Sequence, residues 1–313
     1  MSAPVVALCG GVGGAKLADG LARALGGDEL LIIVNTADDF RHLGLWISPD
    51  IDSVLYALAD LSDPQRGWGR RDESWNFMAA LRQLHGPDWF QLGDADLATH
   101  VERTRRLAAG ESLTSVTDGM RRALGIAARV LPMSDDPVST RLLTDAGWLD
   151  FQEYFVRRRC QPPVQRIEFA GAAKARAQPA ALATLARADL RAVVICPSNP
   201  FVSIEPILSL PGMRAALQAC TAPVIAVTPI IGGQAVKGPA AKMLRELGHE
   251  VSGAAVARRY TGLIDAFILD RTDATAAAIP GISLYPAATL MLSTEDREQL
   301  ARAVLAVADA FER

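Results

Sequence analysis

The sequence predicts an α/β fold built on a doubly wound, mostly parallel, Rossmann-like sheet with an inserted helical and mixed region. Short apolar runs rich in β-branched residues recur along the chain, and most are followed by a loop and then by helically spaced apolar residues. Such alternation is typical of parallel strands joined by right-handed crossovers. The clearest runs are Val5–Leu8, Leu30–Val34, Ala192–Cys196, Ala222–Thr228 and Leu263–Leu269.

The remaining elements suit one large unit with an insertion. We expect residues 1–313 to form a single α/β nucleotide-binding domain, with an inserted subregion at about 62–170 where the chain turns polar and helical. The other expected elements are helices near 113–124, 180–188, 240–247 and 298–311, a strand and turn at 140–149, and short strands at 282–285 and 290–292.

Composition bounds the class of protein. The chain has 313 residues, half of them hydrophobic, which is ample for a large core. No run approaches the eighteen apolar residues of a transmembrane helix, and Val5–Leu8 is too short for the core of a signal peptide. We therefore expect a cytoplasmic protein without a membrane partner, and a homodimer on base rates.

Charge and cysteine content exclude two further classes. The formal net charge is −3, and the one basic run, Arg157–Arg159, is too short for a nucleic-acid-binding arm. No CxxC motif or Cys/His cluster is present, so neither zinc binding nor a disulfide framework is indicated. The four cysteines, which we interpret as small buried hydrophobic residues, are Cys9, Cys160, Cys196 and Cys220.

An acidic segment follows the second strand. Asn35–Asp52 emerges at the carboxyl end of Leu30–Val34, where open α/β sheets place their ligands. Crowded carboxylates repel one another unless a cation lies between them, and hard oxygen ligands suit Mg²⁺ held together with substrate phosphates. Capping of a helix that starts near Ser53 would explain one or two of these aspartates without a ligand. The four are Asp38, Asp39, Asp50 and Asp52.

A glycine loop follows the first strand. Gly10–Gly14 would expose free backbone N–H groups at a helix N-terminus, a common way to bind a diphosphate, and Lys16 would add a positive charge. The loop is neither a Walker A motif nor a GxGxxG fingerprint, because Lys16 stands at the last glycine position of the latter. The alternative is a tightly packed turn between a strand and a helix.

Two later loops have the same design. Pro197–Pro200 forms a rigid elbow after a strand and offers Ser198 and Asn199 to a sugar, base or phosphate. Ile231–Gly238 is a second glycine-rich loop and carries Lys237. Because parallel strands end at one edge of the sheet, these loops should lie together and bind a nucleoside diphosphate with Mg²⁺. No Ser-His-Asp set, Cys-His pair or HExxH motif is evident.

Together these motifs resemble the 2-phospho-L-lactate transferase family of coenzyme F420 biosynthesis over nearly the full length. The motifs are Gly10–Lys16, Asn35–Asp39, Pro49–Asp52, Gly93–His100, Met133–Pro137, Phe151–Phe155, Pro197–Pro200 and Ile230–Met243. The resemblance implies transfer of a phospho-acid group from a guanosine-diphosphate-linked donor to the ribityl hydroxyl of the deazaflavin Fo. It further implies release of GMP, formation of the F420-0 type precursor and a requirement for Mg²⁺.

The resemblance also implies roles by position. Asp39 and Asp52 fall where the family holds Mg²⁺ and orients the acceptor. The segment Phe40–Trp46, with His42, and the pair Arg70–Arg71 depart from the family pattern. These departures leave phospholactate, phosphoenolpyruvate and phosphoglycerate donors open. The residues assigned to the guanosine diphosphate moiety are Gly10, Gly11, Gly13, Gly14, Lys16, Ser198, Asn199, Gly232, Gly233 and Lys237.

Two other functions fit part of this motif pattern. A nucleotide-sugar-binding regulator of the gluconeogenesis-factor type would need the glycine loops but not the full set of aspartates, and the Phe151–Phe155 and Met133–Pro137 motifs count against it. An NAD-dependent dehydrogenase would place Asp38 or Asp39 on the ribose, but Lys16 occupies the third glycine position of its fingerprint.

The sequence favours a direct mechanism because it shows no activated nucleophile. We expect the Fo hydroxyl to attack the donor phosphorus in one displacement, with Asp39 taking the proton. A covalent phospho-enzyme would instead use His42, His100 or Asp135. Asp→Asn at position 39 or 52 is expected to reduce turnover and leave the fold intact, because it removes a charge from a repelling cluster.

Overall fold

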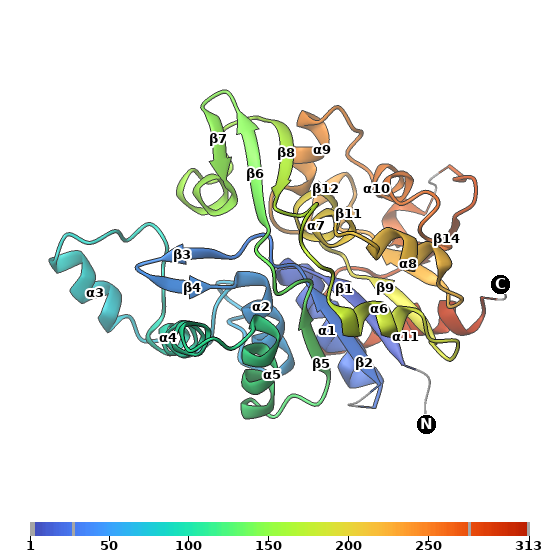
Figure 1. Cartoon of the computed structure of the whole chain (residues 1–313). Helices are drawn as coiled ribbons and strands as arrows, with labels where there is room; N and C mark the ends of the chain where they lie inside the picture. The colour runs from blue at the N-terminus through green and yellow to red at the C-terminus, as the bar shows by residue number, and fades with distance from the viewer. Residues whose placement is uncertain (1–3, 27–28, 275–276, 312–313) are drawn as a thin grey trace.

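A seven-stranded, wholly parallel sheet forms the centre of the molecule in the computed structural model, which describes residues 4–26, 29–274 and 277–311 (Figure 1). The order is β5-β2-β1-β9-β10-β13-β14, and every neighbouring pair is parallel. The strands are β1 (Val5–Cys9), β2 (Leu30–Val34), β5 (Arg129–Pro132), β9 (Ala192–Ile195), β10 (Val224–Val227), β13 (Ala266–Asp270) and β14 (Ser283–Ala287). The predicted doubly wound α/β class is confirmed.

The central strands are buried on both faces, which explains their continuous apolar sequences. All five residues of β1 and of β2 are buried. Successive side chains alternate between two cores: Val6 and Leu8 lie in one, and Val5, Ala7 and Cys9 lie in the other. A doubly wound sheet requires this division, because helices cover both faces.

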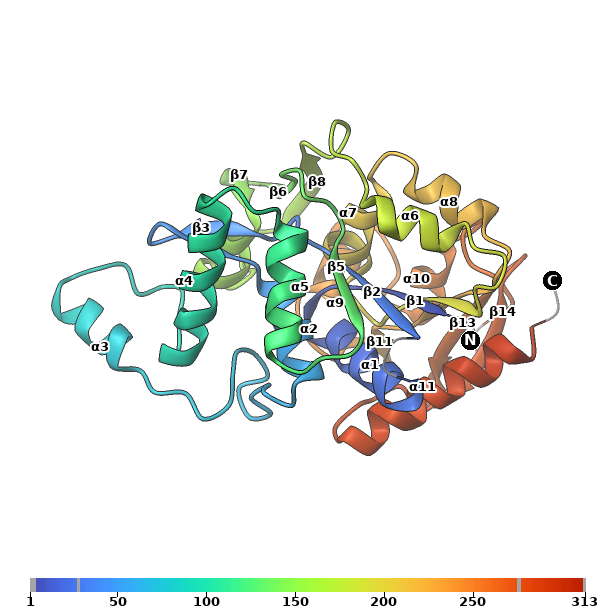
Figure 2. The ribbon, with the colours of Figure 1, turned by 60° about the horizontal axis from the view of Figure 1, so that its bottom comes forward.

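Helices cover both faces of this sheet (Figure 2). The core that contains Val5 is closed by α1 (Gly11–Ala24), α2 (Pro49–Leu58), α5 (Leu113–Ala123) and α11 (Thr294–Asp309). The opposite core is closed by α6 (Pro179–Leu185), α7 (Glu205–Leu208), α8 (Met213–Ala219), α9 (Ala240–Glu246) and α10 (Gly253–Arg259). Among the described residues no helix is long and apolar enough to cross a membrane.

The strand order reverses between β1 and β9. From β1 the chain moves outward to β2 and β5, and it then returns to β9 on the other side of β1 before continuing to β14. Val5 pairs with Leu30 on one side and with Ala192 on the other. The helices that follow β1 and β9 therefore lie on opposite faces of the sheet. Open α/β sheets bind their ligands at such a switch point.

Additional elements lie between β2 and β9. Before α5 come the hairpin β3 (Phe40–His42) and β4 (Leu45–Ile47), then α3 (Asn76–Gln83) and α4 (Asp94–Ala108). After β5 comes the antiparallel sheet β7-β6-β8, made of Ser139–Thr144 (β6), Gly147–Asp150 (β7) and Val164–Ala170 (β8). The predicted insertion at 62–170 spans most of these elements, and β5 within it belongs to the central sheet. The limits of the insertion and the single-domain organisation stay a prediction.

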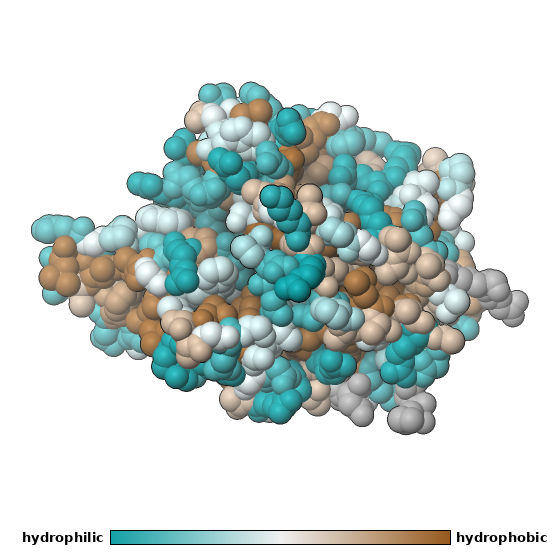
Figure 3. All heavy atoms as spheres, in the orientation of Figure 1, coloured by the Kyte–Doolittle hydropathy of each residue, from teal (hydrophilic) through white to brown (hydrophobic). Residues whose placement is uncertain are grey.

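The α3 region has a small core of its own. Ile47, Met78 and Leu92 are fully or almost fully buried there. Hydrophobic side chains also reach the surface at this end of the molecule (Figure 3), where Leu84 is 79% exposed. The start of α4 is fixed to α3 by the Asp94 carboxylate, which accepts hydrogen bonds from the Asn76 and Phe77 amides at 3.1 and 3.0 Å.

One expected strand and the expected starts of one strand and one helix were wrong. Leu290–Leu292 is not a strand, since the Leu292 amide donates to the carboxylate of Asp296 in the cap of α11. Leu263 precedes β13, which begins at Ala266. Helix α2 begins at Pro49 rather than near Ser53 because proline suits the first turn of a helix, where no N–H is needed.

The crossing of α1 and α11 yields a prediction. A Cβ at Gly20 would lie well inside contact distance of the Arg297 backbone carbonyl, so Gly20→Ala should destabilise the protein by about 1–3 kcal/mol. Gly119→Ala in α5 is the matched control, because its added methyl meets only the movable end of the Arg106 side chain. It should be neutral or stabilise by up to about 1 kcal/mol. Urea unfolding measures both, and equal stabilities would contradict the packing described.

Candidate active site

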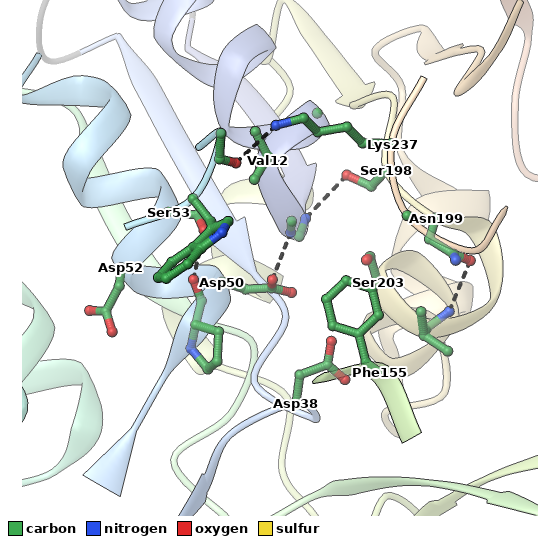
Figure 4. Close-up of a pocket in the computed structure, with 18 of the residues that line it drawn as sticks. Val12, Asp38, Asp50, Asp52, Ser53, Phe155, Ser198, Asn199, Ser203 and Lys237 are labelled. Carbon is green, nitrogen blue, oxygen red and sulfur yellow. Dashed lines mark hydrogen bonds between the residues drawn. The ribbon is translucent and has the colours of Figure 1, made fainter. Parts of the chain in front are cut away.

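A cavity of about 610 Å³ lies at the switch point, at the carboxyl ends of β1 and β9. It brings together residues from segments far apart in the sequence (Figure 4). The first turn of α1, the acidic segment after β2, the elbow after β9 and the loop that carries Lys237 all line it. The predicted convergence of these loops at one edge of the sheet is therefore observed.

The glycine turn is shaped by close packing. A Cβ at Gly10 would lie 2.5 Å from Asp50 Oδ2, and a Cβ at Gly13 would lie 2.6 Å from the Pro197 carbonyl oxygen. Gly11 has a φ of +65°, which favours glycine. The packed-turn interpretation thus accounts for these glycines. It does not compete with anion binding, because Gly11, Val12 and Gly13 line the cavity and the first amides of a helix lack partners within the helix.

The elbow after β9 is held by its own polar side chains. Ser198 Oγ accepts a hydrogen bond from the Gly10 amide at 3.2 Å. Asn199 Oδ1 accepts one from the Phe201 amide at 2.9 Å and caps the π-helical turn η2 (Pro200–Ile204). Both residues line the cavity. These hydrogen bonds fix the elbow against α1, and Asn199 Nδ2 donates to Met243 Sδ at 3.5 Å.

Two lysines face the cavity with backbone partners. Lys16 Nζ donates to the Met291 carbonyl at 2.6 Å, and Lys237 Nζ donates to the Gly67 carbonyl at 3.0 Å. Within the described part of the chain, no carboxylate lies at ion-pair distance from either ammonium. Burial lowers the pKa of both lysines, and the charges of Arg297 and Lys237 lower that of Lys16 further. This end of the cavity therefore suits an anion.

Asp50 and Asp38 form the acidic side of the cavity (Figure 4). Asp50 accepts from the Gly11 amide at 2.7 Å and from Asn35 Nδ2 at 2.9 Å. Burial raises its pKa to about 6 despite these bonds. Burial and the charge of Asp50 also raise the pKa of Asp38 well above its usual range, and Asp38 Oδ1 has no hydrogen-bond partner. The two carboxylates are thus close together and poorly solvated.

Asp39 points to different neighbours. Its Oδ2 accepts hydrogen bonds from Ser48 Oγ at 2.6 Å and from Trp46 Nε1 at 3.2 Å, while Oδ1 is buried without a partner. Burial raises the pKa of Asp39 to about 8. The carboxylate does not line the main cavity, unlike that of its neighbour Asp38. Its predicted roles as metal ligand and base stay predictions.

Asp52 is engaged by a buried arginine. Arg103 on α4 is fully buried, and both of its terminal nitrogens contact the Asp52 carboxylate, Nη1 at 3.1 Å from Oδ2. Nη1 also lies 3.2 Å from His100 Nδ1. Removing one partner of a buried ion pair leaves the other charge uncompensated, which costs about 3–5 kcal/mol. Asp52 is thus paired and does not merely repel its neighbours, so we now expect Asp52→Asn to destabilise the fold.

His100 connects this ion pair to a second carboxylate. His100 Nε2 lies 3.2 Å from Asp96 Oδ2, and Tyr56 donates its hydroxyl proton to Asp96 Oδ1 at 2.6 Å. Burial raises the pKa of Asp96, but the contact with His100 and the Tyr56 hydrogen bond outweigh it and leave the pKa lowered. Ligand atoms of Asp52, Asp96 and His100 lie within 4.8 Å of one another, so this cluster is also chemically suited to a metal.

Aromatic side chains supply the apolar wall of the cavity. Phe151 and Phe155 stack with ring centroids 5.3 Å apart and planes 9° from parallel. Trp89 and Phe90 meet edge to face at 5.7 Å, and Trp68 lies on the loop beside Gly67. These five rings line the cavity. Such a wall can stack against a planar heterocycle.

The structure brings most of the predicted residues together. Those that line the cavity are Gly10, Gly11, Gly13, Lys16, Asp52, Ser198, Asn199 and Lys237. Gly14 packs against Ser198 and Cys9 instead. Gly232 and Gly233 form the turn between β11 (Ile230–Ile231) and β12 (Gln234–Ala235), with φ of +55° and +72°. Two positive φ values are what a tight hairpin turn requires, which explains this glycine pair structurally.

Other singled-out residues have structural partners. Asp135 accepts from the amide and the hydroxyl of Thr114, both at 2.8 Å, and so caps α5. His42 packs edge to face against Trp89 at 5.1 Å, and its Nε2 is buried without a partner. Arg70 lies over the ring of Tyr56 at 5.5 Å. These contacts weaken Asp135 and His42 as sites of a covalent phospho-enzyme.

Sequence reasoning did not select three residues of this site. Asp38 and Asp50 belong to the acidic segment but have no role in the site predicted from the sequence, and no motif points to Arg103. A signal for Arg103 does exist, because Asp96, His100 and Arg103 are spaced at i, i+4 and i+7 and so share one face of α4. A polar stripe at core spacing indicates a buried network.

The fold and the cavity define an α/β protein with an anion-binding cleft at the switch point of its sheet. The family model described as 2-phospho-L-lactate transferase CofD matches residues 5–308, and the chain belongs to this family. It is thus a transferase of coenzyme F420 biosynthesis, which confirms the function that the motifs implied.

Two named relatives match this chain over nearly the full length. A phosphoenolpyruvate transferase from Kitasatospora aureofaciens is 41% identical, with 97% of this chain and 98% of that protein covered. A 2-phospho-L-lactate transferase from Methanosarcina mazei is 40% identical, with 96% and 99% covered. Among solved structures, protein BH3568 from Bacillus halodurans superposes with a TM-score of 0.62 at 15% identity, covering 97% of this chain and all of that one. This last similarity shows the fold alone.

The buried aspartates generate a prediction for the metal-free protein. Where folding raises a carboxyl pKa, the folded state keeps a proton that the unfolded state releases, so stability falls as pH rises toward the folded pKa. The window runs from about pH 4 to about 6 for Asp50 and to about 8 for Asp39. Each group contributes a slope of up to about 1.4 kcal/mol per pH unit.

Unfolding followed in EDTA from pH 5 to 8.5 tests this. Asp39→Asn is the control, because the amide oxygen still accepts from Ser48 and Trp46 while no proton is released. Its stability should fall less steeply than that of the wild type above pH 6. Parallel curves for the two proteins would contradict the raised pKa of Asp39.

Proposed function

We propose that this protein transfers a phospho-acid group from a guanosine-diphosphate-linked donor to the hydroxyl of the deazaflavin Fo, with release of GMP and formation of the F420-0 type precursor. One observation carries the proposal. A single cavity joins the first turn of α1, two lysines with no carboxylate at ion-pair distance among the described residues, buried aspartates and an aromatic wall. The start of α1 and the lysines suit a diphosphate, the aspartates suit a metal, and the aromatic wall suits a planar acceptor ring.

The donor end is assigned to the glycine turn and the loops beside it. The amides at the start of α1 and the Lys237 ammonium suit the diphosphate. Ser198 and Asn199, held on the elbow after β9, are proposed to contact the nucleoside portion. Gly232 and Gly233 support this end indirectly, since their hairpin precedes Lys237.

The acidic side is proposed to hold Mg²⁺. The oxygens fit a hard cation, because Asp38 Oδ1 and Asp39 Oδ1 are buried without partners. Asp39 and Asp52 are the ligands proposed from the sequence, and the cavity-facing Asp38 and Asp50 are added to them. When bound, Mg²⁺ would neutralise charge on the phosphate oxygens.

The acceptor end is assigned to the aromatic wall. Stacking against these rings would orient the deazaflavin so that its ribityl hydroxyl faces the donor phosphorus. A carboxyl with a raised pKa is a suitable base for the hydroxyl proton near neutral pH. Asp39 was predicted for this role from the sequence, and the cavity-lining position of Asp38 supports Asp38 instead.

The mechanism is tested by initial rates over a grid of donor and Fo concentrations. Direct attack requires both substrates on the enzyme together, so double-reciprocal plots should intersect, and the protein mass should stay unchanged after incubation with donor alone. Parallel lines with a phosphorylated adduct would contradict it. The relatives at 41% and 40% identity are named for different acids. The same assay, run with phospholactate, phosphoenolpyruvate and phosphoglycerate donors, would identify the acid that this protein transfers.

Lys237 gives a sharper test of the donor end. Lys237→Ala should weaken GDP binding by about 1.5–3 kcal/mol, roughly tenfold to a hundredfold, because a lysine contact to phosphate is charge-assisted. Guanosine binding should be almost unchanged. Lys174→Ala is the matched control, as that lysine is exposed and remote in sequence from the lining loops. Equal losses for GDP and guanosine in calorimetric titrations would remove Lys237 from the diphosphate site.

The cytoplasmic location and the homodimer expected from the sequence stay proposals. Sedimentation of the purified protein would test the second.

A further inference from the structure

A second, smaller cavity lies beside the first. Its volume is about 90 Å³, and seven residues line both cavities, so the two are contiguous. The shared residues are Val12, Lys16, Ser53, Gly67, Trp68, Gly69 and Lys237. With about 90 Å³ against about 610 Å³ for the main cavity, it suits a small polar group beside a ligand in the main cavity.

Three cationic side chains surround this small cavity. Lys16, Lys237 and Arg297 all line it. Each lysine uses one N–H on a backbone carbonyl, which leaves two donors on each ammonium. Arg297 donates from Nη1 to Asp19 at 3.0 Å, and its Nε is buried without a partner. The charges of Arg297 and Lys237 both lower the pKa of Lys16, in addition to burial, so the cations are close enough to repel one another.

Arg297 is ion-paired with Asp19, whereas among the described residues no carboxylate lies at ion-pair distance from Lys16 or Lys237. Asp63 lines the small cavity, but its Oδ1 accepts from the amides of Gln65 and Arg66 at 2.8 and 3.0 Å, and its Oδ2 lies 3.4 Å from Arg66 Nη1. Asp296 is near enough to raise the pKa of Lys16, but its Oδ2 accepts the Leu292 and Ser293 amides in the cap of α11. A small anion would relieve the repulsion between the two lysines, which have only backbone partners.

We infer that this small cavity binds the carboxylate arm of the transferred phospho-acid, with Lys16 as its principal contact. The inference rests on the proposed function and adds a specificity site to it. An acid esterified to the terminal phosphate extends beyond the diphosphate, and the contiguous small cavity takes that extension. Ala15, Ala57 and Leu292 line its apolar side and suit the methyl or methylene carbon of a three-carbon acid. Lys16 thereby recognises the acid rather than the diphosphate.

The test compares two ligands that differ only in the carboxylate. One is GDP esterified at its terminal phosphate with L-lactate through the lactate hydroxyl, and the other is the ethyl ester of GDP. The wild type should bind the first about tenfold to a hundredfold more tightly, because a charge-assisted contact is gained. Lys16→Met should abolish that preference, and it should weaken the lactate ester more than it weakens GDP. Lys16→Arg should retain the preference, and the exposed Lys174→Met should behave as the wild type.

Each result decides the inference. Equal binding of the two esters by the wild type would overturn it, while GDP binding by the same protein would leave the proposed function standing. If Lys16→Met weakened GDP and both esters alike, Lys16 would belong to the diphosphate, and the inference would also be overturned. Failure of the wild type to bind GDP at all would overturn the proposed donor and this inference with it. Lys16→Gln replaces Lys16→Met if thermal unfolding shows that the latter is not folded.

Discussion

The close approach of two backbone turns is the constraint on which the site depends. At Gly10, Gly13 and Gly14 a side chain would collide with Asp50, with the Pro197 carbonyl or with Ser198. Any such side chain would push the elbow after β9 away from α1, and the cavity at the switch point would lose one wall. The Gly11 amide donates to Asp50, and the next amides of this first turn, at Val12 and Gly13, have no partner within the helix. Packing and anion binding therefore place the same demand on the sequence, which is why neither interpretation of the glycines excludes the other.

Aspartates that stabilise the fold differ from aspartates at the candidate site in whether their carboxylate oxygens have hydrogen-bond partners. Asp94 and Asp135 lie in motifs that drew attention in the sequence, yet each accepts several hydrogen bonds at a helix start. Asp38 and Asp39 each keep one buried oxygen without a partner. A buried polar group left unpaired costs about 1–3 kcal/mol, so two of them in one segment indicate that a ligand completes the arrangement. A cation bound at the acidic segment would therefore stabilise it.

Local patterns in the sequence predicted the strands, the glycine turn, the elbow and their meeting at one edge of the sheet, because burial and strand alternation determine these features. They did not predict which aspartate faces the cavity. Asp38 and Asp39 follow the end of β2, outside the two-residue period that a strand imposes. The pair between Asp52 and Arg103 joins residues 51 positions apart, which no local pattern reveals. The hairpin around the Gly232–Gly233 pair was not predicted, because its strands have only two residues each.

The inserted helices change the charge balance of the cavity. Helix α4 brings Arg103 to Asp52, so one of the four aspartates is neutralised before any ligand binds. One divalent cation comes closer to balancing the negative charge of the other three aspartates than the charge of all four. At the opposite end, Lys16 and Lys237 have only backbone partners. A donor with a diphosphate and a carboxylate fits between these ends, since its negative groups lie against the lysines while its reacting phosphorus points toward the acidic side. Because opposite charges orient a ligand more strongly than apolar contacts do, this polarity would fix which end of the donor meets the acceptor.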